Sequence, residues 1–324
     1  AAVHTVSAKR QPAPPGGAWP EANHSQHKLD KGKTCEEQQH PHPFRGTTAP
    51  KADLYASAGD RSLDGWLEDV KRREPEKPNA EQFAILESVA RRIKYEMRQE
   101  QATEPAPRTS DEEPMLDLIH GLPGTGKSKV IEWLKELFHL IGWQHGVQYV
   151  CLAVQNSMAA SIGGYTIHHW SGIPTAQTEG RAGTKDTSAL SIKCQCLRFI
   201  LIDEISMVSA ELFSVLEHVV QIVVKSRTLW KKRADGSKRV FGGINMLLFG
   251  DWWQLKPVAG TPLFQSPFGS AGNVQKSVGM FWGEGRDAIH HTWELKDMVR
   301  CKDRWYNLFL MGCRDGNLSC GLYN

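Results

Sequence analysis

The octapeptide GLPGTGKS, at 121–128, contains residues of the types that bind phosphate groups. Its three glycines permit a tight turn in which successive backbone N–H groups point toward one anion. A helix that begins at Lys127 adds the positive end of its dipole to the same place. In such a loop Lys127 contacts the β- and γ-phosphates of a nucleotide, and the Ser128 hydroxyl ligates Mg²⁺. The predicted phosphate-binding residues are Gly121, Pro123, Gly124, Thr125, Gly126, Lys127 and Ser128.

A glycine-rich surface turn is the alternative interpretation of this octapeptide. A phosphate loop requires a strand before it and a helix after it. The apolar run MLDLI precedes the octapeptide, and KVIEWLKELF follows with helical periodicity. This context favours the phosphate loop.

An acidic pair follows another apolar run, in RFILIDEISM at 198–207. Nucleotide hydrolysis needs a carboxylate that holds the metal ion and a second group that activates water. We expect Asp203 to position Mg²⁺ and Glu204 to polarise the attacking water. The alternative is that both acids merely cap the helix that begins near Ser206.

A third polar cluster ends the apolar run NMLLF at 245–249, where Gly250, Asp251 and Gln254 follow. Parallel strands bring their carboxyl ends to one edge of a sheet, and ligands bind at that edge. Gln254 is therefore predicted to contact the γ-phosphate and to sense its loss. The alternative is a loop amide that bonds local backbone groups.

The elements that must position these residues follow from the apolar periodicity. Strand-length apolar runs at 115–119, 148–154, 198–202 and 245–249 alternate with helical patterns at 130–141 and 205–224. Continuous apolar strands that alternate with helices are typical of a parallel sheet covered on both faces. The sequence thus predicts an α/β fold of the P-loop NTPase class.

The chain before this domain has a different character. Residues 1–60 contain seven prolines and five histidines but few large aliphatic residues. Such a segment buries too little apolar surface to offset its ordering entropy, so we predict a disordered leader. An amphipathic helix capped by Asn79 should follow, and then a polar connector at 101–114. The predicted buried face of that helix consists of Phe83, Leu86, Ala90, Ile93 and Met97.

Composition narrows the class of protein. No stretch approaches the roughly 18 consecutive apolar residues of a membrane span, and the first residues lack the apolar core of a secretion signal, so we expect an intracellular protein without a membrane partner.

The formal charge is only +3, so affinity for nucleic acid must come from local patches. The clearest candidate patch is 225–243, which has seven basic residues and one acidic residue, and a solvated loop is its alternative. The polar insert between Pro174 and Leu197 is expected to be a mobile excursion.

The order of these motifs resembles that of the Pif-type DNA helicases of superfamily one, which include the helicase portion of Helitron transposons. The motifs that carry the resemblance are NAEQ at 79–82, GLPGTGKS, GGYTIHHWSGI at 163–173, LIDEISM at 201–207, FGG at 241–243 and GDWWQLKPV at 250–258. A weaker match continues over 293–319. The chain departs from the family pattern at Trp252 and Trp253, where phenylalanines are usual, at Lys256, where proline is usual, and at Cys301, where glutamine is usual.

The resemblance implies a RecA-like fold and an ATP-dependent DNA helicase that uses ATP and Mg²⁺. It implies 5′-to-3′ movement along single-stranded DNA, unwinding at duplex junctions, roles in DNA repair, recombination and telomere maintenance, and a place in the nucleus or mitochondrion. By the same resemblance Gln82 reads the adenine edge and Arg300 reaches the γ-phosphate from a second lobe. Thr166 and His168 would lie along the single-stranded DNA. The alternatives are an exposed helix position for Gln82 and a locally bonded ring for His168.

The resemblance also divides the chain into regions. A leader at 1–60 and a helix with its linker at 61–114 precede a RecA-like P-loop ATPase lobe at 115–292. The second RecA-like lobe would begin at 293–324 and continue beyond Asn324. Translocation needs two lobes that close on ATP and open after hydrolysis. A non-motor ATP- or DNA-binding fragment is therefore the main alternative function, and a P-loop kinase, which needs a substrate-phosphate lid, is another.

Overall fold

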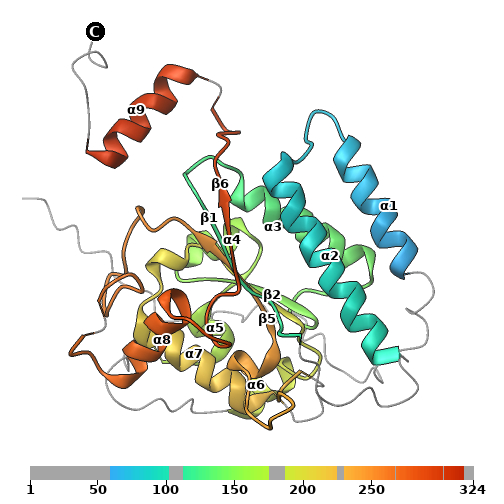
Figure 1. Cartoon of the computed structure of the whole chain (residues 1–324), viewed down its shortest axis with the longest axis vertical. Coiled ribbons are helices and arrows are strands. Elements are labelled where there is room, and N and C mark those ends of the chain that lie inside the picture. The colour runs from blue at the N-terminus through green and yellow to red at the C-terminus, as the bar shows by residue number, and fades with distance from the viewer. Residues whose placement is uncertain are drawn as a thin grey trace, which may run out of the picture. The chain divides into compact units, whose positions relative to one another are not determined.

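The computed structural model describes residues 59–101, 112–174, 187–224, 230–266, 268–301 and 303–316. The predicted leader lies outside these ranges except for Gly59 and Asp60, and so does 102–111 of the predicted connector. Within the described part, a twisted sheet runs through the centre and helices pack on either side of it (Figure 1).

The central sheet has six parallel strands in the order β3-β2-β4-β5-β1-β6. Its strands are β1 (Leu116–Gly121), β2 (Tyr149–Ala153), β3 (Tyr165–Thr166), β4 (Phe199–Ile202), β5 (Asn245–Gly250) and β6 (His291–Leu295). The four predicted strands are confirmed as β1, β2, β4 and β5. The two edge strands were not predicted, because β3 has only two residues and β6 is largely exposed and polar, so neither forms an apolar run.

Helices connect the strands in the order that parallel pairing requires. They are α1 (Gly59–Arg72), α2 (Ala80–Gln101), α3 (Lys127–Leu140), α4 (Asn156–Ser161), α5 (Ile167–Ser171), α6 (Thr187–Lys193), α7 (Ala210–Val223), α8 (Gly272–Trp282) and α9 (Arg304–Asp315). Two short 3₁₀ helices are η2 (Ile205–Met207) and η3 (Val240–Gly243). The predicted helix at 205–224 is thus split, because the Ser209 hydroxyl caps α7 by accepting a hydrogen bond from Leu212 N at 3.2 Å.

Both faces of the sheet are buried, as the continuous apolar strands predicted. Alternate residues point to opposite faces, so Phe199 and Leu201 of β4 join one apolar cluster while Ile200 and Ile202 join the other. The first cluster also contains the buried faces of α1, α2 and α3, and the second contains those of α5, α7 and α8. The α/β fold with helices on both faces is confirmed.

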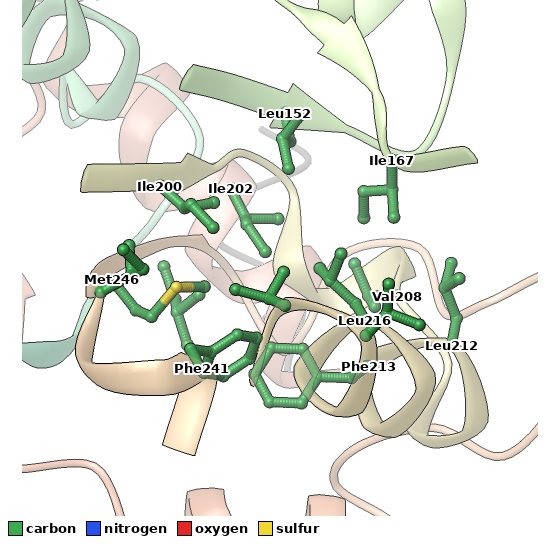
Figure 2. Packing of buried hydrophobic residues seen from close by; sticks show 14 of the residues in the cluster. Leu152, Ile167, Ile200, Ile202, Val208, Leu212, Phe213, Leu216, Phe241 and Met246 are labelled. Carbon is green, nitrogen blue, oxygen red and sulfur yellow. The ribbon is translucent and has the colours of Figure 1, made fainter. Parts of the chain in front are cut away.

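The second cluster shows how the strand that ends in the acidic pair is held. In Figure 2, Ile200 and Ile202 of β4 face Phe213 and Leu216 of α7. The Phe213 ring packs edge-on against Phe241, with 5.3 Å between the ring centroids. Close packing of this kind fixes the end of β4, and therefore the start of the turn that carries Asp203.

The expectation for the insert between Pro174 and Leu197 is wrong over its described half. Residues 187–193 form α6, and Leu190 and Cys194 are buried in the second cluster. Apolar residues at this spacing are enough to anchor a short helix. The stretch 175–186 lies outside the described residues.

No helix in the described part of the chain is both long and apolar enough to cross a membrane.

Candidate nucleotide-binding site

The loop between β1 and α3 has the backbone that the glycine spacing predicted. Gly124 and Gly126 have φ angles of 87° and 86°, in the left-handed region that favours glycine. A Cβ atom on Gly126 would lie 2.4 Å from Gln82 Nε2. Glycine is therefore required at this position by both conformation and space.

Lys127 lies at the start of α3 with a buried side chain. Its ammonium group donates to the carbonyl oxygens of Gly121 at 2.7 Å and Leu122 at 3.2 Å. Burial lowers the pKa of Lys127, whereas the negative charges of Glu204, Asp251 and Asp203 raise it, and the net shift is downward. The lysine therefore lies inside the phosphate loop, and the negative charges of these three carboxylates act on its ammonium group.

Gln82 is buried against the phosphate loop and is not the exposed helix residue of the alternative interpretation. Its amide Nε2 donates to Thr125 O at 2.9 Å, and its Oε1 accepts from Asn79 N at 3.0 Å. The Asn79 side chain in turn accepts from Gln82 N at 2.8 Å, so the predicted cap of α2 is confirmed as a reciprocal capping pair. Gln82 thereby fixes α2 to the loop, and its reading of adenine stays a prediction.

The acidic pair occupies a strained turn at the end of β4, in which Asp203 is buried and Glu204 is half-buried. Asp203 accepts a hydrogen bond from Glu204 N at 3.0 Å. Glu204 has φ 53° and ψ 52°, a left-handed conformation that is uncommon for a residue with a side chain. Its Oε2 atom is buried and has no hydrogen-bond partner among the described residues. Strained, unpartnered groups of this kind concentrate at functional sites.

Both carboxyl groups of this pair titrate above their usual range. Burial raises the pKa of Asp203, and its hydrogen bond from Glu204 N and the charge of Lys127 only partly counteract this. Burial also raises the pKa of Glu204, and the neighbouring Asp203 raises it further. A carboxylate held in this way is a stronger base than one in water.

The end of β5 packs directly on the acidic turn. A Cβ atom on Gly250 would lie 2.8 Å from Ile205 Cγ2 and 3.0 Å from Ile205 N. The hydroxyl oxygen of Ser206, next in the turn, is buried and has no partner in the described part of the chain. The two loops that follow β4 and β5 therefore form one continuous surface beside the phosphate loop.

Asp251 follows Gly250 and is fully buried. Its Oδ1 accepts from Trp253 N at 3.1 Å and lies 3.3 Å from His120 Nε2 on β1. Arg314 of α9 donates to both carboxylate oxygens. The sequence analysis identified neither residue as part of the site. Arg314 lies 63 residues from Asp251, and His120 directly precedes the phosphate loop but has no pattern that links it to Asp251.

Gln254 and Arg300 lie at the border of the site. Gln254 is half-buried, and its backbone N–H donates to Asp251 O at 3.0 Å. The backbone N–H groups of Val299 and Arg300 donate to Gly124 O at 2.9 and 3.1 Å, which places the segment after β6 on the phosphate loop. The Arg300 side chain is exposed, so its contact with a γ-phosphate stays a prediction.

Thr166 and His168 lie at another part of the same sheet edge. Three strands separate β3, which ends at Thr166, from β1 and its loop. Thr166 caps α5 by accepting from His169 N at 3.2 Å, and His168 Nδ1 lies 3.0 Å from Ile173 O. Both side chains have local structural roles, and their DNA contacts stay predictions.

The basic segment is partly structural over 230–243, the part of it that the structure describes. Arg233 and Arg239 are buried and bind the two oxygens of Glu113 at 2.6 and 2.7 Å. Lys232 and Lys238 are exposed, and 225–229 lies outside the described residues. Two of its arginines therefore hold the fold together.

The residues present fit a triphosphate with its metal ion. The loop amides, the Lys127 ammonium group and the exposed Ser128 at the start of α3 offer phosphate and metal ligands at one place. Glu204, whose charge acts on Lys127, has at Oε2 an acceptor without a partner among the described residues. Magnesium bound with a nucleotide needs only one or two protein ligands, because phosphates and water supply the others.

Comparison with known protein families agrees with this geometry. The model of the PIF1-like helicase family matches residues 96–271, which is more than half of the chain. The chain belongs to the PIF1-like helicase family. Its match contains the phosphate loop, the acidic pair and Gln254.

Individual relatives resemble the chain over part of their length. The chain is 30% identical over 183 residues to "ATP-dependent DNA helicase RRM3" of Saccharomyces cerevisiae, covering 50% of this chain and 22% of that protein. It is 34% identical over 143 residues to "ATP-dependent DNA helicase PIF1" of Mus musculus, covering 43% of this chain and 19% of the relative. The chain thus spans about a fifth of the length of these two relatives.

A solved structure shares the fold. The crystal structure of Pif1 helicase from Candida albicans superimposes with a TM-score of 0.52 at 23% identity, over 76% of this chain and 45% of that one. At this identity the similarity establishes the fold alone. It agrees with the RecA-like arrangement that the motif order implied.

Proposed function

We propose that this chain forms the nucleotide-binding first lobe of an ATP-dependent DNA helicase. One observation carries the proposal: the acidic pair after β4, Asp251 after β5 and the phosphate loop after β1 follow three neighbouring parallel strands, so they meet at the carboxyl edge of one sheet. Membership of the PIF1-like family supports coupling of this site to DNA unwinding. The named relatives are DNA helicases, which supports the same substrate here.

The phosphate loop would bind ATP together with Mg²⁺. Backbone N–H groups at the start of α3 and the Lys127 ammonium group would hold the phosphates. Ser128 and Asp203 would hold the metal ion, which when bound neutralises charge on the phosphate oxygens. Gln82 would read the adenine edge, and Gln254 and Arg300 would contact the γ-phosphate.

Glu204 would activate the attacking water. Its free Oε2 can accept a proton from water, and burial beside Asp203 makes it a stronger base. The strained turn holds this oxygen away from hydrogen-bonding partners in the described protein, so water is its natural partner. Replacement of Glu204 by glutamine should therefore abolish hydrolysis while ATP still binds.

Single-stranded DNA would cross the same sheet edge at β3. Tyr165 is 40% exposed and stacks on His145, with 5.2 Å between the ring centroids. The His169 ring lies 5.9 Å from the Tyr165 ring. These rings stand beside Thr166 and His168, and bases stack on exposed aromatic side chains without sequence preference. The proposal includes 5′-to-3′ movement, action at duplex junctions and a place in the nucleus or mitochondrion.

Binding of a labelled oligonucleotide tests the DNA surface. Tyr165→Ala should weaken binding of single-stranded DNA by roughly 1–3 kcal/mol, the usual contribution of one stacked base. Phe268→Ala, which removes a 94% exposed ring elsewhere, is the control and should leave the affinity unchanged. Equal affinities of both variants and the unmodified protein would contradict this assignment.

DNA stimulation of ATP hydrolysis separates a motor lobe from a passive binding module. A motor couples its two sites, so single-stranded DNA should raise the hydrolysis rate of the chain. Hydrolysis that does not respond to saturating DNA would favour the alternative, an ATP- or DNA-binding fragment without unwinding activity.

A further inference from the structure

Helix α9 contacts the nucleotide site through one arginine near its carboxyl end. Arg314 donates from Nη2 to Asp251 Oδ1 at 2.6 Å and from Nη1 to Asp251 Oδ2. Its guanidinium group also lies over the Trp253 ring, 5.6 Å from the centroid. Only 17% of the Arg314 side chain is exposed, whereas Trp305 and Tyr306 on the same helix are 51% and 44% exposed.

The partner of Arg314 is a fully buried charge. Burial raises the pKa of Asp251, but hydrogen bonds from His120 and Arg314 outweigh it and hold the pKa well below its usual range. Asp251 therefore stays ionised. Arg314 is its cationic partner, and removal of one member of a buried ion pair leaves an uncompensated charge.

This ion pair lies beside the phosphate loop, because His120, whose Nε2 is 3.3 Å from Asp251 Oδ1, directly precedes Gly121. The positive charge of Arg314 lowers the pKa of Lys127, and the negative charge of Asp251 raises the pKa of both Lys127 and Glu204. Arg314 and Lys127 therefore repel each other when no anion lies between them. A triphosphate at the loop would relieve this repulsion and attract both cations. The guanidinium group has five N–H donors and uses only two for the bidentate contact with Asp251.

The pair also holds the turn that carries Gln254. Asp251 accepts from Trp253 N with its side chain and from Gln254 N with its backbone oxygen. Arg314 clamps the carboxylate and covers Trp253 at the same time. Any displacement of α9 therefore reaches the turn at 251–254 directly.

We propose that Arg314 is a positioning residue, and that its ion pair with Asp251 is a nucleotide-linked latch between α9 and the Gln254 turn. Nucleotide at the phosphate loop tightens the latch, and the closed latch strengthens nucleotide binding by the same factor, since coupling is reciprocal. The link to nucleotide rests on the proposed function, whereas the latch itself does not.

Amide hydrogen exchange with and without nucleotide tests the latch. The variants are Arg314→Gln and the matched control Arg304→Gln, which changes an exposed arginine on the same helix. Without nucleotide, Arg314→Gln should speed exchange at 304–315 and at 251–254 and leave α3 unchanged. Arg304→Gln should match the unmodified protein. Unchanged exchange at 304–315 in Arg314→Gln, or loss of protection throughout the sheet, would overturn the latch.

The second arm adds adenylyl imidodiphosphate and Mg²⁺. In the unmodified protein, protection should rise at 121–128 and also at 304–315, and in Arg314→Gln only the first rise should remain. The affinity for this nucleotide should fall about fivefold in Arg314→Gln, the lower end of typical coupling. Protection at 121–128 without any change at 304–315 would refute the nucleotide link alone. No protection at 121–128 would refute the proposed function and the link together. The exchange measured without nucleotide would still show whether Arg314 holds α9 to the turn at 251–254.

Discussion

The amino ends and the carboxyl ends of the parallel strands, here called the amino edge and the carboxyl edge of the sheet, differ in how their buried charges are partnered. At the amino edge, Glu113 binds Arg233 and Arg239, one with each oxygen. Near it, Glu96 accepts from Arg92 Nε and from Asn245 Nδ2, each at 2.7 Å, although Arg92 Nη2 has no partner among the described residues. At the carboxyl edge Asp251 is paired with Arg314, but Glu204 Oε2 and Ser206 Oγ have no partner among the described residues. Lys127 donates to backbone carbonyl oxygens there.

This difference indicates that the amino edge stabilises the fold, whereas the carboxyl edge keeps groups available for a ligand. Buried ions that are matched in pairs hold one conformation. Unmatched groups cost stability, and they persist where a ligand completes them. The pKa directions agree with this division, because the two arginines lower the pKa of Glu113 in spite of its burial, while burial and Asp203 raise that of Glu204.

The largest effect on stability is expected at the amino edge. Glu113→Gln removes the carboxylate that Arg233 and Arg239 share, although Arg233 keeps its contact with Asp287. This should lower the free energy of unfolding by about 3–5 kcal/mol. Chemical denaturation measures this. Glu87→Gln, at an exposed position of α2, is the control and should change it by less than about 0.5 kcal/mol. Similar losses in the two variants would remove the distinction between the edges.

A smaller effect is expected where β5 meets the acidic turn. Gly250→Ala forces a Cβ atom against Ile205 and should cost about 1–3 kcal/mol of stability. Because Ile205 follows Glu204, hydrolysis should fall as well. Gly65→Ala, which has open space around its Cβ position, should not reduce stability. Wild-type hydrolysis in Gly250→Ala would show that this packing does not position Glu204.

The smallest expected change in stability is at Glu204, and it is an increase, whereas the change at the amino edge is a decrease. Glu204→Gln removes a half-buried carboxylate whose Oε2 has no partner among the described residues, and it should raise the free energy of unfolding at neutral pH by about 1 kcal/mol. The folded-state pKa of Glu204 is raised, so the unmodified protein loses stability as the pH rises through that pKa. Thermal melts should therefore show the two proteins converging below the usual glutamate pKa of about 4.3. Glu284→Gln, an exposed control, should show no such pH dependence. Destabilisation by Glu204→Gln at neutral pH would contradict the unpaired state.

Patterns among residues close in sequence predicted the four central strands of the sheet and the phosphate loop. Four strands follow from continuous apolar runs, and the loop follows from glycine spacing, because both depend on near neighbours in sequence. The edge strands have no such signal, since β3 is two residues long and β6 exposes most of its side chains. The predicted cap of α2 is likewise a local interaction and is confirmed.

Long-range partners were beyond prediction from composition and spacing. Arg314 meets Asp251 across 63 residues, and Arg239 meets Glu113 across 126. The same limit explains why spacing alone left the burial of Gln82 open, since its side chain donates to Thr125 O, 43 residues away. A basic run in sequence therefore indicated a nucleic-acid surface, although two of its arginines are structural.

Nucleotide affinity and hydrolysis in two variants test most directly whether the loop and the acidic pair form one site. Lys127→Ala should abolish ATP binding, and Glu204→Gln should keep the affinity while hydrolysis falls by at least about 100-fold. Lys129→Ala, at a surface position two residues further along α3, is the control and should retain both properties. Unchanged ATP affinity in Lys127→Ala, or wild-type hydrolysis in Glu204→Gln, would contradict the shared site.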